Sequence, residues 1–269
     1  MKRPQHLPDF TSPPLSEVVL GVQFKPITKY TSIVGARIWE LFKDEFPLVE
    51  EHPILAPTYE TFGARQPTKD IQLQFGAPSV GQRFWFISPD SSHLLQLQSD
   101  RFLANWRKRI EYGEYPRYEE ILTKYRERYG KLTDYVLNEL GTSVHVNQVE
   151  VTYVNHILVQ DFQEAPQWFS FLAGNELNVE AFNASFSEVI KNTNGAPRAR
   201  LIYDLQSALS SDGKQKAYRF SLTFRGQPED ANEKSIFEFF NKGRNEIVKR
   251  FAEYTTPFAH KQWERLDEH

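Results

Sequence analysis

The sequence predicts an α+β protein, built on a large curved antiparallel sheet with two long helices packed on one face. Several segments alternate apolar and polar residues, as strands with one buried face do. Two long segments instead repeat apolar residues at spacings of three and four, as helices with one buried face do. Short turns join successive strands, which favours antiparallel pairing, so the helices must cover the apolar face of the sheet.

Length and composition are those of a globular protein. The chain has 269 residues, of which 40% are hydrophobic and 14% aromatic, and its formal net charge is −3. We expect one merged domain over residues 15–269, preceded by an extended, proline-rich arm over residues 1–14. The absence of cysteine excludes disulfides and thiolate metal sites. No stretch approaches the roughly 20 apolar residues of a membrane helix, so we expect a cytoplasmic protein without membrane contact.

The first half of the domain, residues 15–141, begins with a strand and ends with a long helix. Val18 and Leu20 alternate with residues of the other face, which indicates a half-buried strand. A helix over residues 34–46 follows, because its apolar residues keep helical spacing. The other elements expected in this half are strands over residues 58–62, 70–75 and 83–88, a hairpin over 94–107, and a long helix ending near Leu140 with Gly141 at its C-cap.

The second half, residues 142–269, repeats this order without visible sequence identity. A long strand over residues 145–160 opens it, and a short aromatic segment, PQWFSFLAG, takes the place of the first half's short helix. Strands are expected over residues 179–190, 200–208 and 216–225, and a long helix after Pro228. We therefore expect pseudo-repeated β-α-β(n)-α halves that share one sheet, as in TBP-like (TATA-binding-protein-like) or helix-grip-like architectures.

Several segments resemble landmarks of a sporadically distributed, uncharacterised family of bacterial proteins of about this length. They are PPLSEVVLGVQF, LLQLQSDRFLANWRK followed by YPRYEEI, VNQVEVTYVN and the terminal TPFAHKQW, of which NWR and YPRY are the most specific. The resemblance covers nearly the whole chain. It implies a single-unit bacterial protein with the patchy occurrence of mobile-island, toxin–antitoxin or defence genes, and it supplies no catalytic residue and no ligand.

Motifs for common catalytic and cofactor chemistry are absent from the sequence. No HxH or HExxH spacing indicates a metal site, no GxSxG marks a nucleophile elbow, and no Walker loop or GxGxxG marks a nucleotide cradle. The adjacent Glu119 and Glu120 fit compensation of a helix dipole at the start of a helix. We therefore expect no catalytic residue, no metal and no cofactor.

Glutamines recur on the polar side of the predicted strands, opposite the apolar residues that face the helices. By strand parity this set comprises Gln23, Gln72, Gln74, Gln96 and Gln98, and Gln148 and Thr152 extend it. A polar concave sheet is how saddle-shaped proteins hold a partner, so this face is a candidate ligand or partner surface. A solvated face of an antiparallel sheet explains the same pattern without a function.

The segment around Trp106 adds further candidate ligand residues. Alternation points Trp106 to the core and leaves Asn105 and Arg107 on the other side. Arg107 could clamp a carboxylate or phosphate of a ligand, or pair with a carboxylate near the sheet edge. Asn155 joins the candidates, because Arg107 or Asn155 could converge on a cavity between the sheet and a long helix.

Basic and aromatic residues are interleaved over residues 101–131. The candidate basic patch consists of Arg101, Lys108, Arg109 and Arg117. Such a mixture can bind single-stranded nucleic acid through phosphate contacts and base stacking. A solvated helix face with i,i+4 pairs such as Glu120 with Lys124 fits the same pattern, and the negative net charge favours this interpretation.

These observations favour a non-catalytic cytoplasmic interaction protein whose partner is another protein. A homodimer also fits, because long strands can leave a sheet edge that requires cover. Two alternatives stay open at this point. One is a small-molecule binder or enzyme with a cavity between the sheet and a long helix, and the other is a protein that binds single-stranded nucleic acid through residues 101–131.

Overall fold

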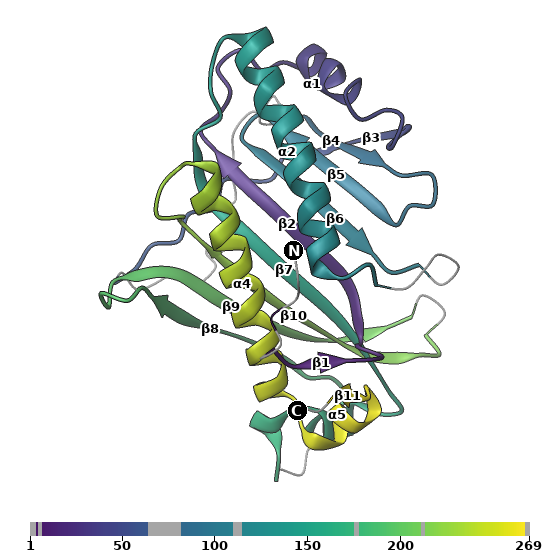
Figure 1. Ribbon diagram of the computed structural model, residues 1–269. Helices are drawn as coiled ribbons and strands as arrows, with labels where there is room; N and C mark the ends of the chain where they lie inside the picture. The colour runs from purple at the N-terminus through teal and green to yellow at the C-terminus, as the bar shows by residue number, and fades with distance from the viewer. Residues whose placement is uncertain are drawn as a thin grey trace, which may run out of the picture.

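The computed structural model describes residues 4, 7–63, 82–109, 115–174, 178–210 and 213–266 of the chain. In this part, a nine-stranded antiparallel sheet forms one layer and two long helices form a second layer on one of its faces (Figure 1). The predicted α+β class with a large antiparallel sheet is therefore confirmed.

The sheet is continuous across both halves of the chain. Its strand order is β3-β4-β5-β6-β2-β7-β10-β9-β8, so β2 and β7 pair in the middle, and β3 and β8 are the edges among the described strands. The strands are β2 (Leu15–Phe24), β3 (Leu48–Pro53), β4 (Gln82–Ile87), β5 (His93–Gln98), β6 (Arg101–Arg107), β7 (Val146–Val159), β8 (Asn183–Lys191), β9 (Pro197–Leu209) and β10 (Lys216–Gly226). A separate pair joins β1 (Asp9–Phe10) to β11 (Arg265–Leu266), which ties the N-terminal arm beside α4.

The long helices α2 (Tyr118–Leu140) and α4 (Glu233–Tyr254) lie on the same face of the sheet (Figure 1). The Tyr125 ring of α2 lies 5.2 Å from the Phe240 ring of α4, measured between centroids, so the helices contact each other as well as the sheet. Gly141 adopts a left-handed conformation with φ +65° and caps α2, as predicted. The shorter elements are α1 (Ser32–Trp39), the 3-10 turn η1 (Phe162–Glu164), α3 (Ala165–Trp168), the 3-10 turn η2 (Ser170–Leu172) and α5 (Pro257–Gln262).

The core fills the space between the helices and the sheet. Strand alternation brings Val18, Leu20 and Val22 to the helix side, where at most 1% of each residue is exposed. The Tyr125 side chain is fully buried, and its hydroxyl donates to the Phe102 carbonyl at 3.2 Å. Because the inner strands use one side for this core, their alternate residues point to the opposite face.

Three local predictions in the first half need correction or lie outside the described residues. The helix expected over residues 34–46 ends at Trp39, where turns begin. The Trp39 indole donates to the Phe46 carbonyl at 2.8 Å, and the turns still bury Phe42 and Phe46. Residues 58–62 are extended but form no strand, because sheet side chains bind their backbone. The strand expected over residues 70–75 lies outside the described residues, as do Gln72 and Gln74.

Candidate functional site

The polar face of the sheet is the face turned away from α2 and α4. Strand parity places on it the described members of the predicted glutamine set and two residues of β6, namely Gln23, Gln96, Gln98, Gln148, Asn105 and Arg107. The glutamines are buried, and their exposed fractions range from 1% for Gln148 to 7% for Gln96. The part of this face that carries the glutamines is therefore covered, in contrast to a simple solvated sheet surface.

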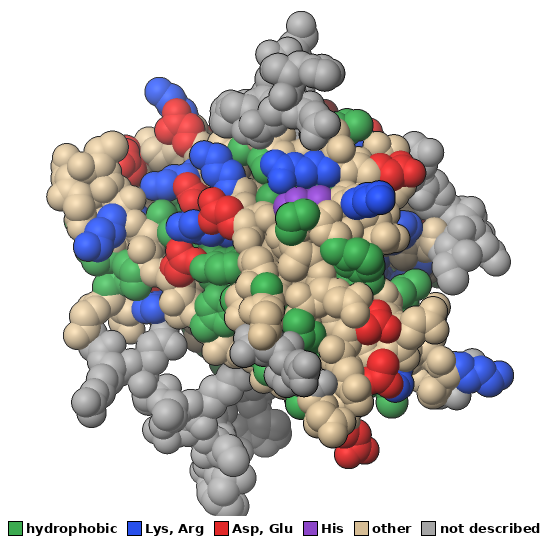
Figure 2. Space-filling model, turned by 90° about the horizontal axis from the view of Figure 1, so that it is seen from below, with side chains coloured by type: hydrophobic (Ala, Val, Ile, Leu, Met, Phe, Trp, Pro, Cys, Tyr) green, Lys and Arg blue, Asp and Glu red, His purple; other side chains and the backbone are tan. Residues whose placement is uncertain are grey.

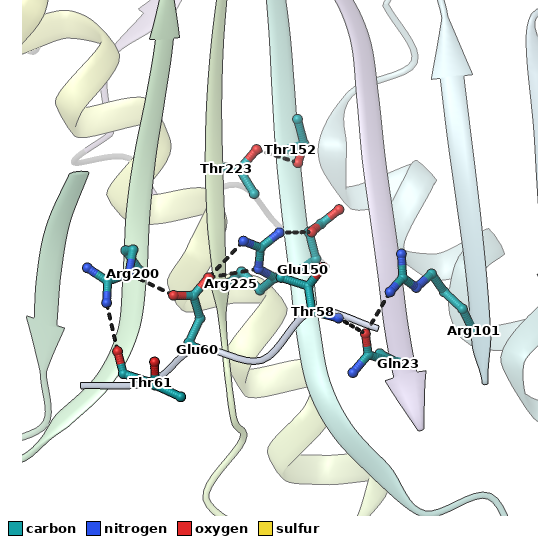
Figure 3. Close-up of polar contacts among 10 residues, drawn as sticks. All are labelled: Gln23, Thr58, Glu60, Thr61, Arg101, Glu150, Thr152, Arg200, Thr223 and Arg225. Carbon is teal, nitrogen blue, oxygen red and sulfur yellow. Dashed lines mark hydrogen bonds and ion pairs between the residues drawn. The ribbon is translucent and has the colours of Figure 1, made fainter. Parts of the chain in front are cut away.

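The cover is an extended segment, residues 54–62, which we call the strap. The Leu55 N–H donates to Gln98 Oε1 at 3.0 Å, and Gln98 Nε2 donates back to the Leu55 carbonyl at 2.9 Å. The Thr58 N–H donates to Gln23 Oε1 at 2.8 Å (Figure 3). Side chains of the sheet thus bind the strap's backbone, which explains why two glutamines of the predicted set are buried.

Two arginines bind further carbonyl groups of the strap. Arg101 donates to the Ala56 carbonyl at 3.0 Å and also to Gln23 Oε1 at 2.6 Å. Arg200 of β9 donates to the Thr61 carbonyl at 2.9 Å (Figure 3). The strap therefore crosses the sheet from β5 to β9, and its main chain is bound along this path.

Glu60 anchors the strap by its side chain. It is the only strap residue that is buried, and 3% of its side chain is exposed. Arg200 Nε donates to one carboxylate oxygen at 2.7 Å and Arg225 Nε to the other at 2.8 Å. Arg225 also pairs with Glu150 at 3.0 Å, so two guanidinium groups balance two carboxylates (Figure 3).

A small polar cavity of about 20 Å³ remains between the strap and the sheet, beside Gln23, Arg101 and Gln148. Within the described residues, neither the oxygen nor the nitrogen of the Gln148 amide has a hydrogen-bond partner, and the same holds for Arg101 Nε. A buried polar group without a partner costs about 1–3 kcal/mol. The strap therefore leaves part of the hydrogen-bonding capacity of this face unused.

A chain of hydrogen bonds extends the polar face towards β4. Arg83 donates to Gln96 at 3.0 Å, and Gln96 donates to Asn105 at 2.9 Å. Asn105 in turn donates to the Glu17 carboxylate at 2.7 Å. The amide of Asn105 is thus fixed by the strands on both sides.

Arg107 lies beside an aromatic ring. Its guanidinium carbon is 5.8 Å from the centroid of the Trp85 ring, and His52 stacks on the same ring with centroids 3.9 Å apart. In the described part of the chain, Arg107 forms no ion pair within 4.0 Å. Pairing with a carboxylate near the sheet edge was one of the two roles expected for Arg107, and the described residues do not show this pair.

The residues of the predicted basic patch lie apart. Arg101 binds the strap, Arg109 donates to the Ser91 carbonyl at 3.1 Å, and Arg117 pairs with Asp9 at 3.0 Å on the helix side. Lys108 is exposed after β6. Figure 2 views the end of the molecule that lies at the bottom of Figure 1, and basic and acidic side chains are interspersed over it.

The helix face of residues 101–131 carries an expected ion pair. Lys124 and Glu120 are 2.7 Å apart at i,i+4 spacing on α2. Both side chains are largely exposed, so this pair contributes little to stability but belongs to an ordinary solvated helix surface.

A second cavity, which we call the helix-side cavity, lies between the sheet, the two long helices and the N-terminal arm. Its volume is about 80 Å³, and its polar lining includes Tyr115, Tyr118, Glu119, Tyr153, Asn155 and Arg244. Asn155 belongs to this cavity, and its amide donates to the Phe220 carbonyl at 3.1 Å. Arg107 is on the other face of the sheet, so of these two candidates only Asn155 lines the cavity.

Sequence reasoning did not identify Glu60, Arg200, Arg225 and Arg244. Strand alternation puts Arg200 and Arg225 on the polar face, but nothing local marks Glu60 as their partner, because it is 140 and 165 residues away in the chain. Arg244 has a local signal, since it falls at helical spacing between Phe240 and Ile247 on the apolar stripe of α4. A charged residue in such a stripe is buried and must be bound by something.

No group of His, Asp and Glu side chains within the described ranges is arranged to hold a metal ion. Among the helices described, none is long and apolar enough to cross a membrane. No protein-family model matches this chain, and comparisons with curated proteins and with solved structures find no match. The strap site on the polar face and the helix-side cavity are therefore the features from which a function can be inferred.

Proposed function

We propose that the chain is a non-catalytic interaction protein, and that its polar face binds an extended, acidic segment of a protein partner in exchange for the strap. One observation carries this proposal. The strap is itself an extended segment on that face, and its carboxylate is held by Arg200 and Arg225 at 2.7 and 2.8 Å.

The chemistry of this face suits an extended peptide. Gln98, Gln23 and Arg101 bind backbone groups, which every peptide has, so they impose little sequence preference. The Arg200 and Arg225 guanidiniums add selectivity, because planar guanidinium groups bind carboxylates in a defined geometry. An extended segment with one Glu or Asp at the matching position is the expected partner.

The strap has the properties of an exchangeable occupant. Apart from Glu60, its residues are half-buried or exposed, and segments held by few buried contacts open at low cost. Because the strap is part of the same chain, its effective concentration at the polar face is on the order of millimolar. A partner segment must compete with this concentration to bind. The Gln148 amide and Arg101 Nε are not hydrogen-bonded to the strap. A partner segment that forms hydrogen bonds with them therefore gains binding free energy that the strap does not have, and it can displace the strap.

A labelled peptide with the strap sequence, ILAPTYETF, tests this proposal. Fluorescence anisotropy would measure its affinity for the wild-type chain and for Glu60→Gln, whose own strap is weakened. We expect the variant to bind the peptide at least about 10-fold more tightly than the wild type, because the intramolecular competitor is weaker. The same peptide with Gln in place of Glu should bind the variant on the order of 100-fold more weakly, because it lacks the carboxylate that Arg200 and Arg225 bind.

Two controls make the result interpretable. Glu40→Gln removes an exposed carboxylate that pairs with Lys43 at 2.6 Å, and it should leave peptide binding at the wild-type level. Circular dichroism would establish that Glu60→Gln is folded. A folded variant that binds the two peptides equally well, or binds neither, contradicts the proposal.

The strand order supports a pseudo-repeat as part of this proposal. Read outward from the middle pair, β2-β6-β5-β4 and β7-β10-β9-β8 follow the same course, and in each half a long helix follows the last of these strands in the chain. A TBP-like saddle, in which a sheet face holds a partner, is the architecture we propose from this order.

The proposal includes the setting that the family resemblance implies. We place the protein in a bacterial cytoplasm and in a mobile-island, toxin–antitoxin or defence locus. A second copy of the chain, paired through β3 or β8 at the sheet edges, is the alternative partner.

A further inference from the structure

Two buried hydrogen-bond donors of residues that line the helix-side cavity are not used. Arg244 Nε and the Tyr118 hydroxyl have no partner within the described residues, although only 4% of Arg244 and 3% of Tyr118 are exposed. Both residues line the cavity. Buried donors are nearly always paired in proteins, so two free donors beside one cavity indicate a place for a bound molecule.

The arginine is held in position by its other contacts. Arg244 Nη2 donates to Glu119 at 3.1 Å, and its guanidinium carbon lies 4.7 Å from the centroid of the Tyr118 ring. A guanidinium fixed by an ion pair and an aromatic ring needs little ordering when a ligand binds. The free Nε–H is therefore fixed in place, but less than 1 Å² of this atom is exposed, so side chains of the cavity wall must shift slightly before a ligand can accept from it.

The remaining walls are apolar and aromatic. The apolar lining includes Phe10, Leu15, Ile247, Val248 and Phe251, and the hydroxyls of two further lining residues, Tyr115 and Tyr153, lie 3.4 Å apart. Burial raises the pKa of Tyr115 to about 12, so this hydroxyl is neutral at physiological pH. Such walls fit the flat face of a small ring.

The charges of the cavity are balanced. Arg244 is neutralised by Glu119, and Arg117 by Asp9, with ion-pair distances of 3.1 and 3.0 Å. An anionic ligand at Arg244 would lie close to the Glu119 carboxylate and be repelled by it. An uncharged acceptor gains the free hydrogen bonds without this repulsion.

We infer that the helix-side cavity binds a small uncharged molecule with a flat apolar body and a carbonyl group. The carbonyl oxygen accepts hydrogen bonds from Arg244 Nε and the Tyr118 hydroxyl, and the body packs against Phe10 and Phe251. The cavity holds about 80 Å³ and is partly open, so it takes one ring with part of the molecule at the mouth. This site is on the opposite face of the sheet from the strap. Ligand binding here is therefore a second activity, beyond the peptide binding proposed for the polar face.

Benzamide and benzoate are the probes that test this inference, because they share a ring and differ in charge. Saturation-transfer NMR would measure their affinities for the full chain. We expect saturable binding of benzamide and at least 10-fold weaker binding of benzoate. Tyr118→Phe and Arg244→Lys each remove one donor, so each should weaken benzamide binding about 5- to 10-fold.

A matched control is Tyr129→Phe, which removes a hydroxyl from the same helix but outside the cavity, and it should leave benzamide affinity unchanged. Glu60→Gln should also leave benzamide affinity unchanged, so the benzamide experiment and the peptide experiment can fail independently of each other. Absence of saturable benzamide binding overturns the inference. Equal affinity in folded Tyr118→Phe and wild type, or tighter binding of benzoate, overturns it as well.

Discussion

Replacing Glu60 with Gln probes the anchor of the strap while keeping the size of the side chain. The carboxylate is 3% exposed and accepts hydrogen bonds from Arg200 and Arg225 at 2.7 and 2.8 Å. The substitution leaves the buried guanidinium of Arg200 and the half-buried guanidinium of Arg225 facing an amide that carries no charge. The strap should therefore detach from the sheet more often.

The expected size of the effect follows from the partners that stay. Breaking a buried ion pair by removing one member costs about 3–5 kcal/mol. Arg225 keeps Glu150 at 3.0 Å and Arg200 keeps the Thr61 carbonyl at 2.9 Å, so we expect the lower limit, about 3 kcal/mol. This corresponds to an opening constant of the strap raised on the order of 100-fold.

Amide hydrogen exchange measures this opening at the strap. The Leu55 and Thr58 amides, which donate to Gln98 and Gln23, should lose most of their protection in Glu60→Gln. Amides of β2 and β7 should keep theirs, because the strap can open without unfolding the sheet.

The exposed control Glu40→Gln should change the strap's exchange by less than a factor of about 3, as expected for a surface ion pair. If Glu60→Gln changed the strap's exchange as little as this control does, the carboxylate would not be the anchor. Loss of protection throughout the sheet would also contradict the reasoning, because it would make the strap part of the core.

Two further predictions concern the scaffold. Gly243→Ala should lower the free energy of unfolding by about 1–3 kcal/mol in urea denaturation, because the new Cβ would lie 2.8 Å from the Phe224 ring. Gly130→Ala, which meets nothing within 4 Å, should raise it by about 0.5–1 kcal/mol; equal effects would contradict the packing described. At Asp90, burial favours the neutral acid, but hydrogen bonds from neighbouring serines outweigh it and lower the pKa to about 2. The folded state therefore binds fewer protons than the unfolded state, and this stabilisation is present above about pH 4 and lost as the pH falls through about 2. Asp90→Asn should thus cost about 1 kcal/mol at pH 7 and progressively less as the pH falls to 2 and below, and a pH-independent difference would refute it.

The elements that sequence patterns predict well are those with one buried face. The alternation in β2 and β7 and the apolar stripes of α2 and α4 are direct consequences of packing against a single core. The edge strand β3 was not predicted because its residues are almost all exposed, so burial imposes no alternation on LVEEHP. Among the described strands, β3 pairs only with β4, and this pairing gives it its strand conformation.

The polar face shows a different limit of sequence reasoning. Parity identifies which residues lie on it, because parity depends only on strand geometry. Its cover could not be identified, since the strap reads as a short strand yet has no backbone ladder. Glu60 meets Arg225 across 165 residues of sequence, and only the assembled sheet brings them together.

The decisive measurement is amide hydrogen exchange of the strap in the wild-type chain, with and without a saturating acidic partner peptide such as ILAPTYETF. If the peptide replaces the strap on the polar face, the intramolecular Leu55 and Thr58 amides should exchange faster when the peptide is bound. The amides of β2 and β10 should stay protected. Bound peptide with unchanged or slower exchange in the strap would show that binding occurs elsewhere, and that the polar face is not the surface that recognises extended acidic segments.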